Sequence, residues 1–246
     1  VYWRVCMKNI IKHKVKFKGR ANVLFLHGYG QNKEMMYPLA KRVQNIANYL
    51  VVDLPGNENN PLNKPYTIED YITYIEDVLD RENFIPNIIV GHSFGGKLAA
   101  FYALKHPTTL LLLAPSIIKP SFSIKKFFKV MLYKIFKNLK KVKIIKNIPV
   151  FLKGSRDYQS TSGVNRITFL NIVNSYLNKK KLSSLSNEVY IVYGNSDQEI
   201  TYKQMQKLNK YCPNSHLIVI NGDHFAYLLN VNAIANLILA IIRETC

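Results

Sequence analysis

Short apolar segments alternate along the chain with segments whose apolar residues recur every three or four positions. The short segments are rich in Val, Ile and Leu, a pattern typical of strands that are buried on both faces. Helical segments between them predict parallel strands joined by helices on both faces of a sheet. The predicted strands are residues 22–26, 49–54, 88–90, 110–113, 189–193 and 217–220, and the predicted helices are 33–46, 67–82, 93–105, 201–209 and 229–243. We therefore predict an α/β fold with a mostly parallel central sheet.

The N-terminal region predicts one further strand. Residues 14–18 alternate strictly between lysine and apolar residues, which is typical of a half-exposed edge strand protected by charge. Residues 1–6 precede Met7 and are left out of the fold prediction.

The alternation stops between Ser116 and about residue 187. Residues 122–139 place apolar side chains at helical spacing with lysines around them, and residues 160–177 predict a second helix. No internal repeat or low-complexity linker interrupts this segment. We therefore predict a helical cap at residues 116–186, inserted into a core that consists of residues 7–115 and 187–246.

Length and composition limit the class of protein. A chain of 246 residues with 48% hydrophobic residues suits one α/β domain with an insertion. No apolar run is long enough to cross a bilayer, and the N-terminus lacks the pattern of a signal peptide. The three cysteines are scattered outside any motif, which favours a reducing compartment. We therefore expect a cytoplasmic protein without a disulfide framework or a metal site.

The chain carries a formal charge of +19, from 34 Lys and Arg against 15 Asp and Glu. Residues 116–178 contain 13 Lys and Arg and a single acidic residue, Asp157. A charge this large favours polyanions or anionic membrane surfaces, although solvated faces of a lysine-rich protein are the simpler explanation. We predict no nucleic-acid partner, and a weak association with an anionic membrane surface remains open.

The segment 88–100 carries the main candidate chemistry. Its apolar strand ends in Gly91-His92-Ser93-Phe94-Gly95 and continues into helix-forming residues. A strand, a sharp turn with G-x-S-x-G and a helix together form a nucleophile elbow, in which the serine is held in a strained conformation at the strand's end. The alternative is a glycine-rich turn whose serine only caps the helix.

Two further residues fit the needs of a serine nucleophile. The hydroxyl requires a base to take its proton, and the base requires an acid to fix its tautomer. Asp197 and His224 each follow a predicted strand, so both lie at the sheet edge where Ser93 lies. Asp223 is the alternative acid, although it is adjacent to the histidine that it would have to orient.

Acyl transfer also needs donors for the developing oxyanion. The backbone N–H of Phe94 follows the nucleophile directly, and the turn at 27–30 brings the N–H of Tyr29. His27 and His92 are interpreted as turn and packing residues rather than bases.

At this point the chain resembles the α/β-hydrolase superfamily, in particular small bacterial serine hydrolases of the esterase type with a helical cap. The motifs that carry the resemblance are Leu26-His27-Gly28-Tyr29-Gly30, Asp53-Leu54-Pro55-Gly56, Gly91-His92-Ser93-Phe94-Gly95-Gly96, Gly194-Asn195-Ser196-Asp197 and Gly222-Asp223-His224. The resemblance implies Ser93 as nucleophile, Asp197 as acid, His224 as base, and Tyr29 and Phe94 as oxyanion donors. Gly56-Asn57-Glu58-Asn59 departs from the family's usual G-x-G-x-S, which leaves the shape of that loop open.

We therefore predict a cofactor-independent serine hydrolase that cleaves a small or medium carboxylic ester, or a thioester or lactone, through an acyl-enzyme on Ser93. Phe127, Phe128 and Met131, on the apolar stripe of the cap, are predicted to line the substrate pocket. Two alternatives remain: a ligand-binding or signalling module with little turnover, and a peripheral membrane lipase that docks through its basic cap.

Overall fold

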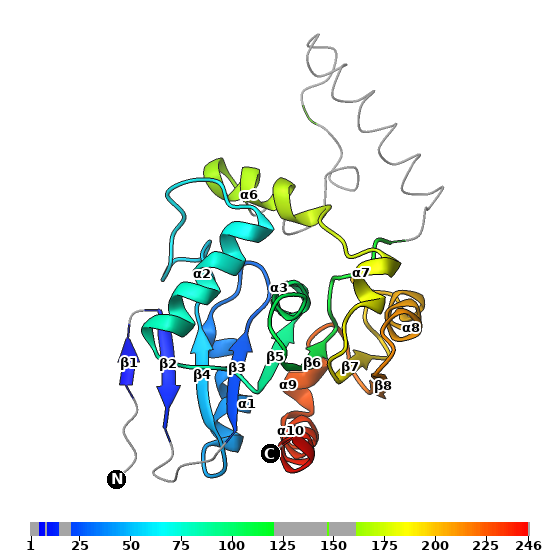
Figure 1. Ribbon diagram of the computed structural model, residues 1–246. Coiled ribbons are helices and arrows are strands. Elements are labelled where there is room, and N and C mark those ends of the chain that lie inside the picture. Colours follow the sequence, from blue (N-terminus) through cyan, green and yellow to red (C-terminus); the bar gives the residue numbers. More distant parts are fainter. Residues whose placement is uncertain (1–4, 8, 15–20, 121–146, 148–160, 246) are drawn as a thin grey trace.

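The computed structural model describes residues 5–7, 9–14, 21–120, 147 and 161–245. Eight strands in these ranges form one sheet in the order β1-β2-β4-β3-β5-β6-β7-β8 (Figure 1). They are β1 Val5–Met7, β2 Ile10–His13, β3 Asn22–Leu26, β4 Asn48–Val52, β5 Ile88–His92, β6 Thr109–Leu113, β7 Val189–Gly194 and β8 Ser215–Ile220. The strands from β4 to β8 in this order run parallel, whereas β2 pairs antiparallel with β1 and β4. The prediction of a mostly parallel α/β sheet is confirmed.

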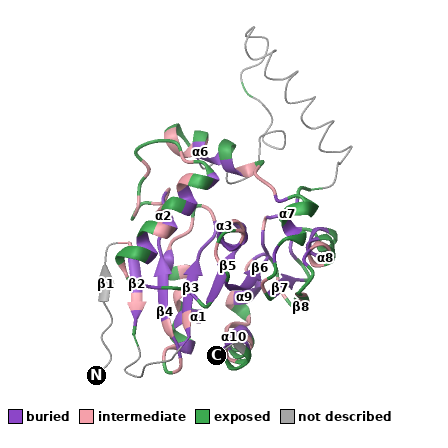
Figure 2. Cartoon of the chain, in the orientation of Figure 1, coloured by how far each residue is buried: buried purple, intermediate pink, exposed green. Residues whose placement is uncertain are grey.

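Helices cover both faces of the sheet. Successive side chains of a strand point to opposite faces, and they contribute to two separate apolar clusters. One cluster includes Tyr71 of α2, Leu98 of α3 and Met205 of α8, and the other includes Leu39 of α1 and Ile238 of α10. The central strands are therefore buried along their length (Figure 2). The helices are η1 Lys33–Met35, α1 Tyr37–Val43, α2 Ile68–Arg81, α3 Phe94–Ala103, α6 Gly163–Val173, α7 Lys179–Ser183, α8 Tyr202–Tyr211, α9 Ala226–Leu229 and α10 Val231–Thr245.

Most predicted elements agree with these bounds to within a few residues. The helix predicted at 33–46 is divided into the 3-10 helix η1 and α1, and Pro38 stands in the first turn of α1. Proline suits that position because the first N–H groups of a helix have no intrahelical acceptor. The helix predicted at 229–243 is α10, which the short α9 precedes. No helix of the described ranges is long and apolar enough to cross a membrane.

The N-terminal edge differs from the prediction. The strand next to β4 is β2, which ends at His13, and Lys14 lies outside any strand. Residues 15–18 of the predicted edge strand lie outside the described residues. β1 includes Val5 and Cys6, which the prediction left out, and it pairs antiparallel with β2. The strand predicted at 14–18 is thus not observed at Lys14 and stays a prediction for residues 15–18.

The described part of residues 116–186 is attached to the core by α6. This helix lies within the second predicted cap helix and beyond the upper end of the sheet in Figure 1. The Tyr29 hydroxyl donates to the Asn165 carbonyl at 2.9 Å, and Thr168 Oγ1 accepts from the Tyr66 N–H at 2.9 Å. α6 is thus held over the loops that follow β3 and β4. The division into a core and an inserted cap stays a prediction, since residues 122–139 lie outside the described part.

A buried lysine also joins α6 to the core. Lys97 of α3 is 3% exposed, and its Nζ donates to the Ile172 carbonyl at 3.1 Å and lies 4.9 Å from the ring centroid of Tyr176. Burial lowers the pKa of Lys97 to about 8. The unfolded chain therefore holds this proton more tightly than the folded chain does.

We expect Lys97 to make the stability of the protein depend on alkaline pH. Because the folded pKa is lowered, the contribution of Lys97 to the free energy of unfolding rises as pH increases from about 8 towards the ordinary lysine value of about 10.4. Relative to the Lys97→Met variant, the wild type should gain about 3 kcal/mol over that window, as an order of magnitude. Urea unfolding of both proteins across the window measures this difference. Lys41→Met, at an exposed lysine of α1, is the control, and a pH-independent difference for Lys97→Met would contradict the burial argument.

Candidate active site

Ser93 occupies a strained turn between β5 and α3. Its φ is 49° and its ψ is −105°, a left-handed conformation that costs a residue other than glycine about 1–3 kcal/mol. The surrounding backbone holds it there: the Ser93 N–H donates to the Leu113 carbonyl of β6 at 2.9 Å, and the Ser93 carbonyl accepts from Lys97 N at 3.1 Å and Ser116 N at 3.2 Å. The turn is therefore fixed from the neighbouring strand and from its own helix.

Glycines allow the strand and helix to approach this closely. A Cβ atom on Gly95 would lie 2.3 Å from the Leu26 carbonyl oxygen, and one on Gly91 would lie 2.6 Å from the Gly95 carbonyl oxygen. Both distances are too short for any side chain, so the elbow requires glycine at both positions.

The hydroxyl of Ser93 does not cap α3. Ser93 stands at the N-cap position, but its side chain makes no capping hydrogen bond. The simpler interpretation of the motif, a serine that only caps the helix, is therefore wrong for this turn. A hydroxyl that is not committed to the backbone is available for other chemistry.

Asp197 and His224 lie in contact at the ends of β7 and β8. His224 Nδ1 donates to Asp197 Oδ2 at 2.8 Å, and the other carboxylate oxygen accepts from the backbone N–H groups of Glu199 at 2.7 Å and Ile200 at 3.0 Å. Burial alone would raise the pKa of Asp197, but the hydrogen bonds from His224 and the two N–H groups outweigh it and hold the pKa below its ordinary value. Asp197 is thus a buried carboxylate that orients the His224 ring.

Asp223 does not have this relation to His224. Its Oδ1 accepts from the Phe225 N–H at 2.8 Å, and the residue is exposed. The sequence left Asp223 open as the acid, whereas the contact with His224 Nδ1 is made by Asp197.

His92 connects the serine turn to the His224 loop. Its Nε2 donates to the His224 carbonyl at 3.0 Å, and the centroids of the two rings are 4.8 Å apart. Burial lowers the pKa of His92 to about 3, and the nearby His224 ring acts in the same direction. His92 is therefore a neutral packing residue, in agreement with its interpretation from the sequence, and it places the turn of Ser93 against the loop of His224.

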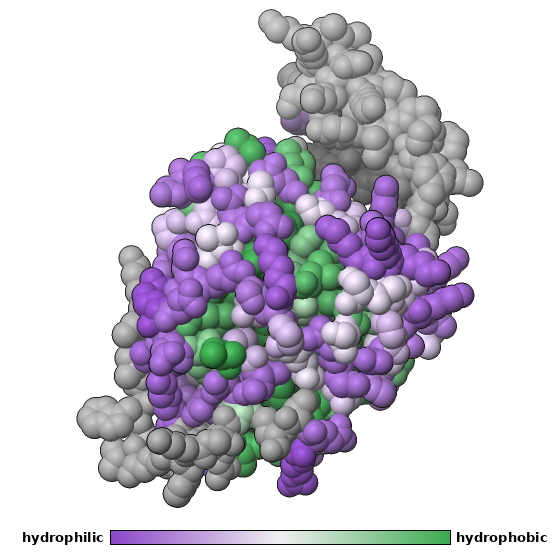
Figure 3. Space-filling view, viewed as in Figure 1, coloured by the Kyte–Doolittle hydropathy of each residue, from purple (hydrophilic) through white to green (hydrophobic). Residues whose placement is uncertain are grey.

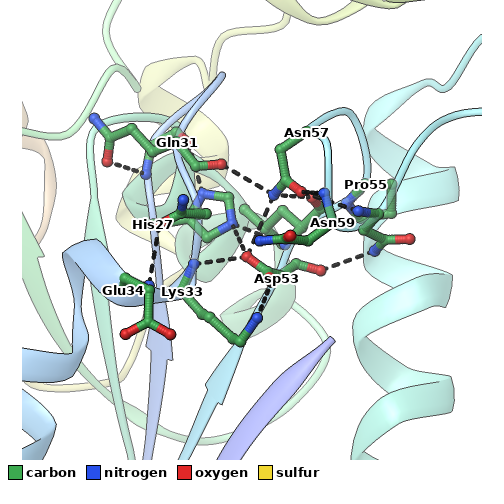
Figure 4. A network of polar contacts seen from close by, with 12 residues as sticks. His27, Gln31, Lys33, Glu34, Asp53, Pro55, Asn57 and Asn59 are labelled. Carbon is green, nitrogen blue, oxygen red and sulfur yellow. Dashed lines mark hydrogen bonds and ion pairs between the residues drawn. The ribbon is translucent and has the colours of Figure 1, made fainter. Parts of the chain in front are cut away.

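His27 belongs to a buried network of polar contacts around the loops after β3 and β4 (Figure 4). The Leu54 N–H donates to His27 Nε2 at 2.9 Å, so the proton is on Nδ1, which donates to the Gly28 carbonyl at 2.8 Å. Burial lowers the pKa of His27 to about 4. Beside it, Asp53 accepts from the backbone N–H and the ammonium of Lys33, both at 2.6 Å. This network fixes the loops after β3 and β4 rather than supplying a base.

Asn57 gives the loop at 56–59 its shape, where the sequence departs from the family pattern. Its Nδ2 donates to the Gln31 and Leu54 carbonyls at 3.0 and 3.2 Å, and its Oδ1 accepts from the N–H groups of Asn59 and Asn60. One amide thus joins this loop to the turn after β3. The contact depends on residues far apart in the sequence, so local pattern could not predict it.

The two predicted oxyanion residues lie against each other. The rings of Tyr29 and Phe94 meet edge to face with centroids 5.8 Å apart, and Phe169 of α6 lies 5.4 Å from Tyr29. Phe94 is the first residue of α3, so the helix itself provides no acceptor for its N–H. Phe169 was not found from the sequence, because an aromatic residue on an apolar helix gives no signal of which loop it will cover.

An open cleft of about 810 Å³ begins beside Tyr29. Three segments line it: the turn after β3, the loop after β4 and the start of α6. Its lining residues are Tyr29, Gly30, Gln31, Asn32, Gly56, Asn57, Glu58, Asn59, Pro61, Leu62, Thr161, Ser162, Val164 and Asn165. The lining is mainly polar, and polar side chains also cover most of the face seen in Figure 3. The predicted pocket residues Phe127, Phe128 and Met131 lie outside the described residues, as do most of the lysines of the predicted cap.

Comparison with known proteins places the chain in a family. A family model described as the alpha/beta hydrolase fold matches residues 21–144, just over half of the chain. The chain therefore belongs to the α/β hydrolase fold family. The predictions of this family and of a hydrolase enzyme are confirmed.

Individual relatives and structures agree with this assignment. The pimeloyl-acyl-carrier protein methyl ester esterase of Wigglesworthia glossinidia brevipalpis is 24% identical over 240 residues, which are 85% of this chain and 89% of that protein. The protein of the same name from Pseudoalteromonas atlantica is 35% identical over 100 residues, 39% of this chain and 37% of that protein. Among solved structures, MenH from S. aureus aligns with a TM-score of 0.69 at 18% identity, covering 97% of this chain and 99% of that chain. At this identity the structural likeness shows the fold.

Proposed function

We propose that the chain is a cofactor-independent serine hydrolase of carboxylic esters, in which Ser93 is the nucleophile, His224 the base and Asp197 the acid that orients it. The observation that carries the proposal is the pairing of a strained serine elbow with the buried hydrogen bond from His224 Nδ1 to Asp197. Both lie at the ends of strands of one sheet, and His92 holds the two loops together. Relatives that are named as methyl ester esterases support the ester as substrate class.

Each residue has a defined part in the reaction. His224 Nε2 takes the proton of the Ser93 hydroxyl as the oxygen attacks the acyl carbon, and Asp197 stabilises the imidazolium that forms. The backbone N–H groups of Tyr29 and Phe94 donate to the oxyanion of the tetrahedral intermediate. The protonated His224 then gives its proton to the departing alcohol. In the second stage His224 takes a proton from water, the water oxygen attacks the acyl carbon, and the proton returns to Ser93 as the acid leaves. Thioesters and lactones present the same acyl carbon and belong to the same proposal.

A panel of short-chain p-nitrophenyl esters, methyl esters and thioesters tests this function. We expect turnover that a fluorophosphonate stops when one equivalent has reacted, because covalent modification of one serine removes the nucleophile. Wild-type rates equal to those of Ser93→Ala across the panel would contradict the proposal and favour a ligand-binding module. Turnover that requires anionic liposomes would favour a membrane lipase.

A further inference from the structure

Glu199 places a second carboxylate beside His224. Its Oε2 lies 3.6 Å from His224 Nε2, while Asp197 Oδ2 lies 2.8 Å from Nδ1 on the other side of the ring. The two acids differ in their surroundings, because the side chain of Asp197 is fully buried and that of Glu199 is 58% exposed. One imidazole ring thus has a carboxylate near each of its nitrogens.

The buried acid also positions the exposed one. Asp197 Oδ1 accepts from the backbone N–H of Glu199 at 2.7 Å, and Oδ2 of the same carboxylate accepts from His224 Nδ1. The N–H of Ile200 adds a third bond to this carboxylate at 3.0 Å. The backbone of Glu199 is therefore tied to the carboxylate that orients the ring.

Two other titratable residues of the described chain lie close to His224, one in contact with its ring and one next to it in the sequence. His92 of β5 faces the ring and stays neutral, because burial lowers its pKa to about 3. Asp223, next to His224 in the chain, is exposed and accepts the Phe225 N–H. Asp197 and Glu199 are thus two carboxylates that face the His224 ring, one near each nitrogen.

We propose that Glu199 is a second acidic partner of His224, which stabilises the protonated ring from the side of Nε2. A neutral ring with its proton on Nδ1 presents the lone pair of Nε2 to the carboxylate, which is unfavourable. A protonated ring presents an N–H there, which is favourable. Glu199 thus acts on the nitrogen that takes the Ser93 proton in the reaction proposed above, and the kinetic part of this inference rests on that proposal.

Titration of the ring tests the inference without any substrate. The Cε1–H signal of His224, assigned by its loss in His224→Gln, is followed by NMR against pH in the wild type and in Glu199→Gln. We expect the midpoint to fall by about 0.5–1 pH unit in Glu199→Gln, the size expected for two unit charges at this separation in water. The difference should shrink at about 1 M salt, where the screening length is about 3 Å.

Glu188→Gln is the matched control. Glu188 Oε2 lies 3.3 Å from Nε2 of another histidine, His216, on the exposed edge of the sheet. Removing that carboxylate should leave the His224 midpoint unchanged. An unchanged midpoint in Glu199→Gln would overturn the inference, and so would an equal change in Glu188→Gln.

The pH profile of ester hydrolysis provides a second readout. The acidic limb of kcat/KM should move to lower pH in Glu199→Gln, so that on this limb the variant keeps about 3- to 10-fold more of its plateau activity than the wild type does. A profile identical to that of the wild type would contradict the inference. If the NMR midpoint moves and the wild type hydrolyses no ester, the inference that Glu199 stabilises the protonated ring holds, and the proposed function fails. If esters are hydrolysed and the midpoint does not move, only the inference about Glu199 fails.

Discussion

Replacing Ser93 with alanine is expected to lower kcat for a carboxylic ester by about 10⁶-fold, because the residues of a triad act as a unit and no other group replaces the nucleophile. The fold should remain, since the hydroxyl makes no capping bond to α3 and alanine has the same Cβ atom as serine. Steady-state kinetics measure the loss, and thermal unfolding of both proteins shows whether the variant is folded.

Ser116→Ala serves as the control for this substitution. The backbone N–H of Ser116 donates to the Ser93 carbonyl at 3.2 Å, so Ser116 is close to Ser93. The substitution Ser116→Ala removes a hydroxyl there and leaves this backbone hydrogen bond in place. We expect it to keep activity and to be labelled by a fluorophosphonate, whereas Ser93→Ala is not labelled. Loss of activity and labelling in Ser116→Ala, with both retained in Ser93→Ala, would show that the assignment of Ser93 as the nucleophile is wrong.

The parts of the molecule that could be predicted from the sequence depend on short-range pattern. β3, β5 and β7 are continuous apolar runs, and burial on both faces requires such runs. The elbow around Ser93 was visible because its glycines and its strand-to-helix order fall within a few residues. Asp197 and His224 were found since each directly follows a predicted strand, and parallel strands bring their carboxyl ends to one edge.

The parts that could not be predicted depend on contacts between distant residues. The side-chain amide of Asn57 joins two loops, and the ammonium of Lys97 donates to the carbonyl of Ile172. The carboxylate of Glu199 lies near Nε2 of His224. Asparagine in a loop, lysine in a helix and glutamate near a helix are all usual on a protein surface, so composition gives no sign of these contacts. The helices α7 and α9 were missed for another reason: they are too short to show a helical period.

Asp197→Asn is expected to lower kcat by about 10⁴-fold through a change of tautomer. Two backbone N–H groups, of Glu199 and Ile200, donate to Oδ1 of Asp197, so the oxygen of an asparagine amide should stay at that position. Its NH₂ group then faces His224 Nδ1, which must become the acceptor. The proton moves to Nε2, and the ring can no longer take the proton of Ser93.

Asp223→Asn separates this effect from a general loss of negative charge near His224. Asp223 is exposed, and its Oδ1 accepts a local bond from the Phe225 N–H, which an asparagine oxygen can also accept. Kinetics of both variants at the plateau of the pH profile should therefore show a large loss for Asp197→Asn and near wild-type activity for Asp223→Asn. The reverse result would make Asp223 the acid and would leave the hydrogen bond between Asp197 and His224 with a structural role only.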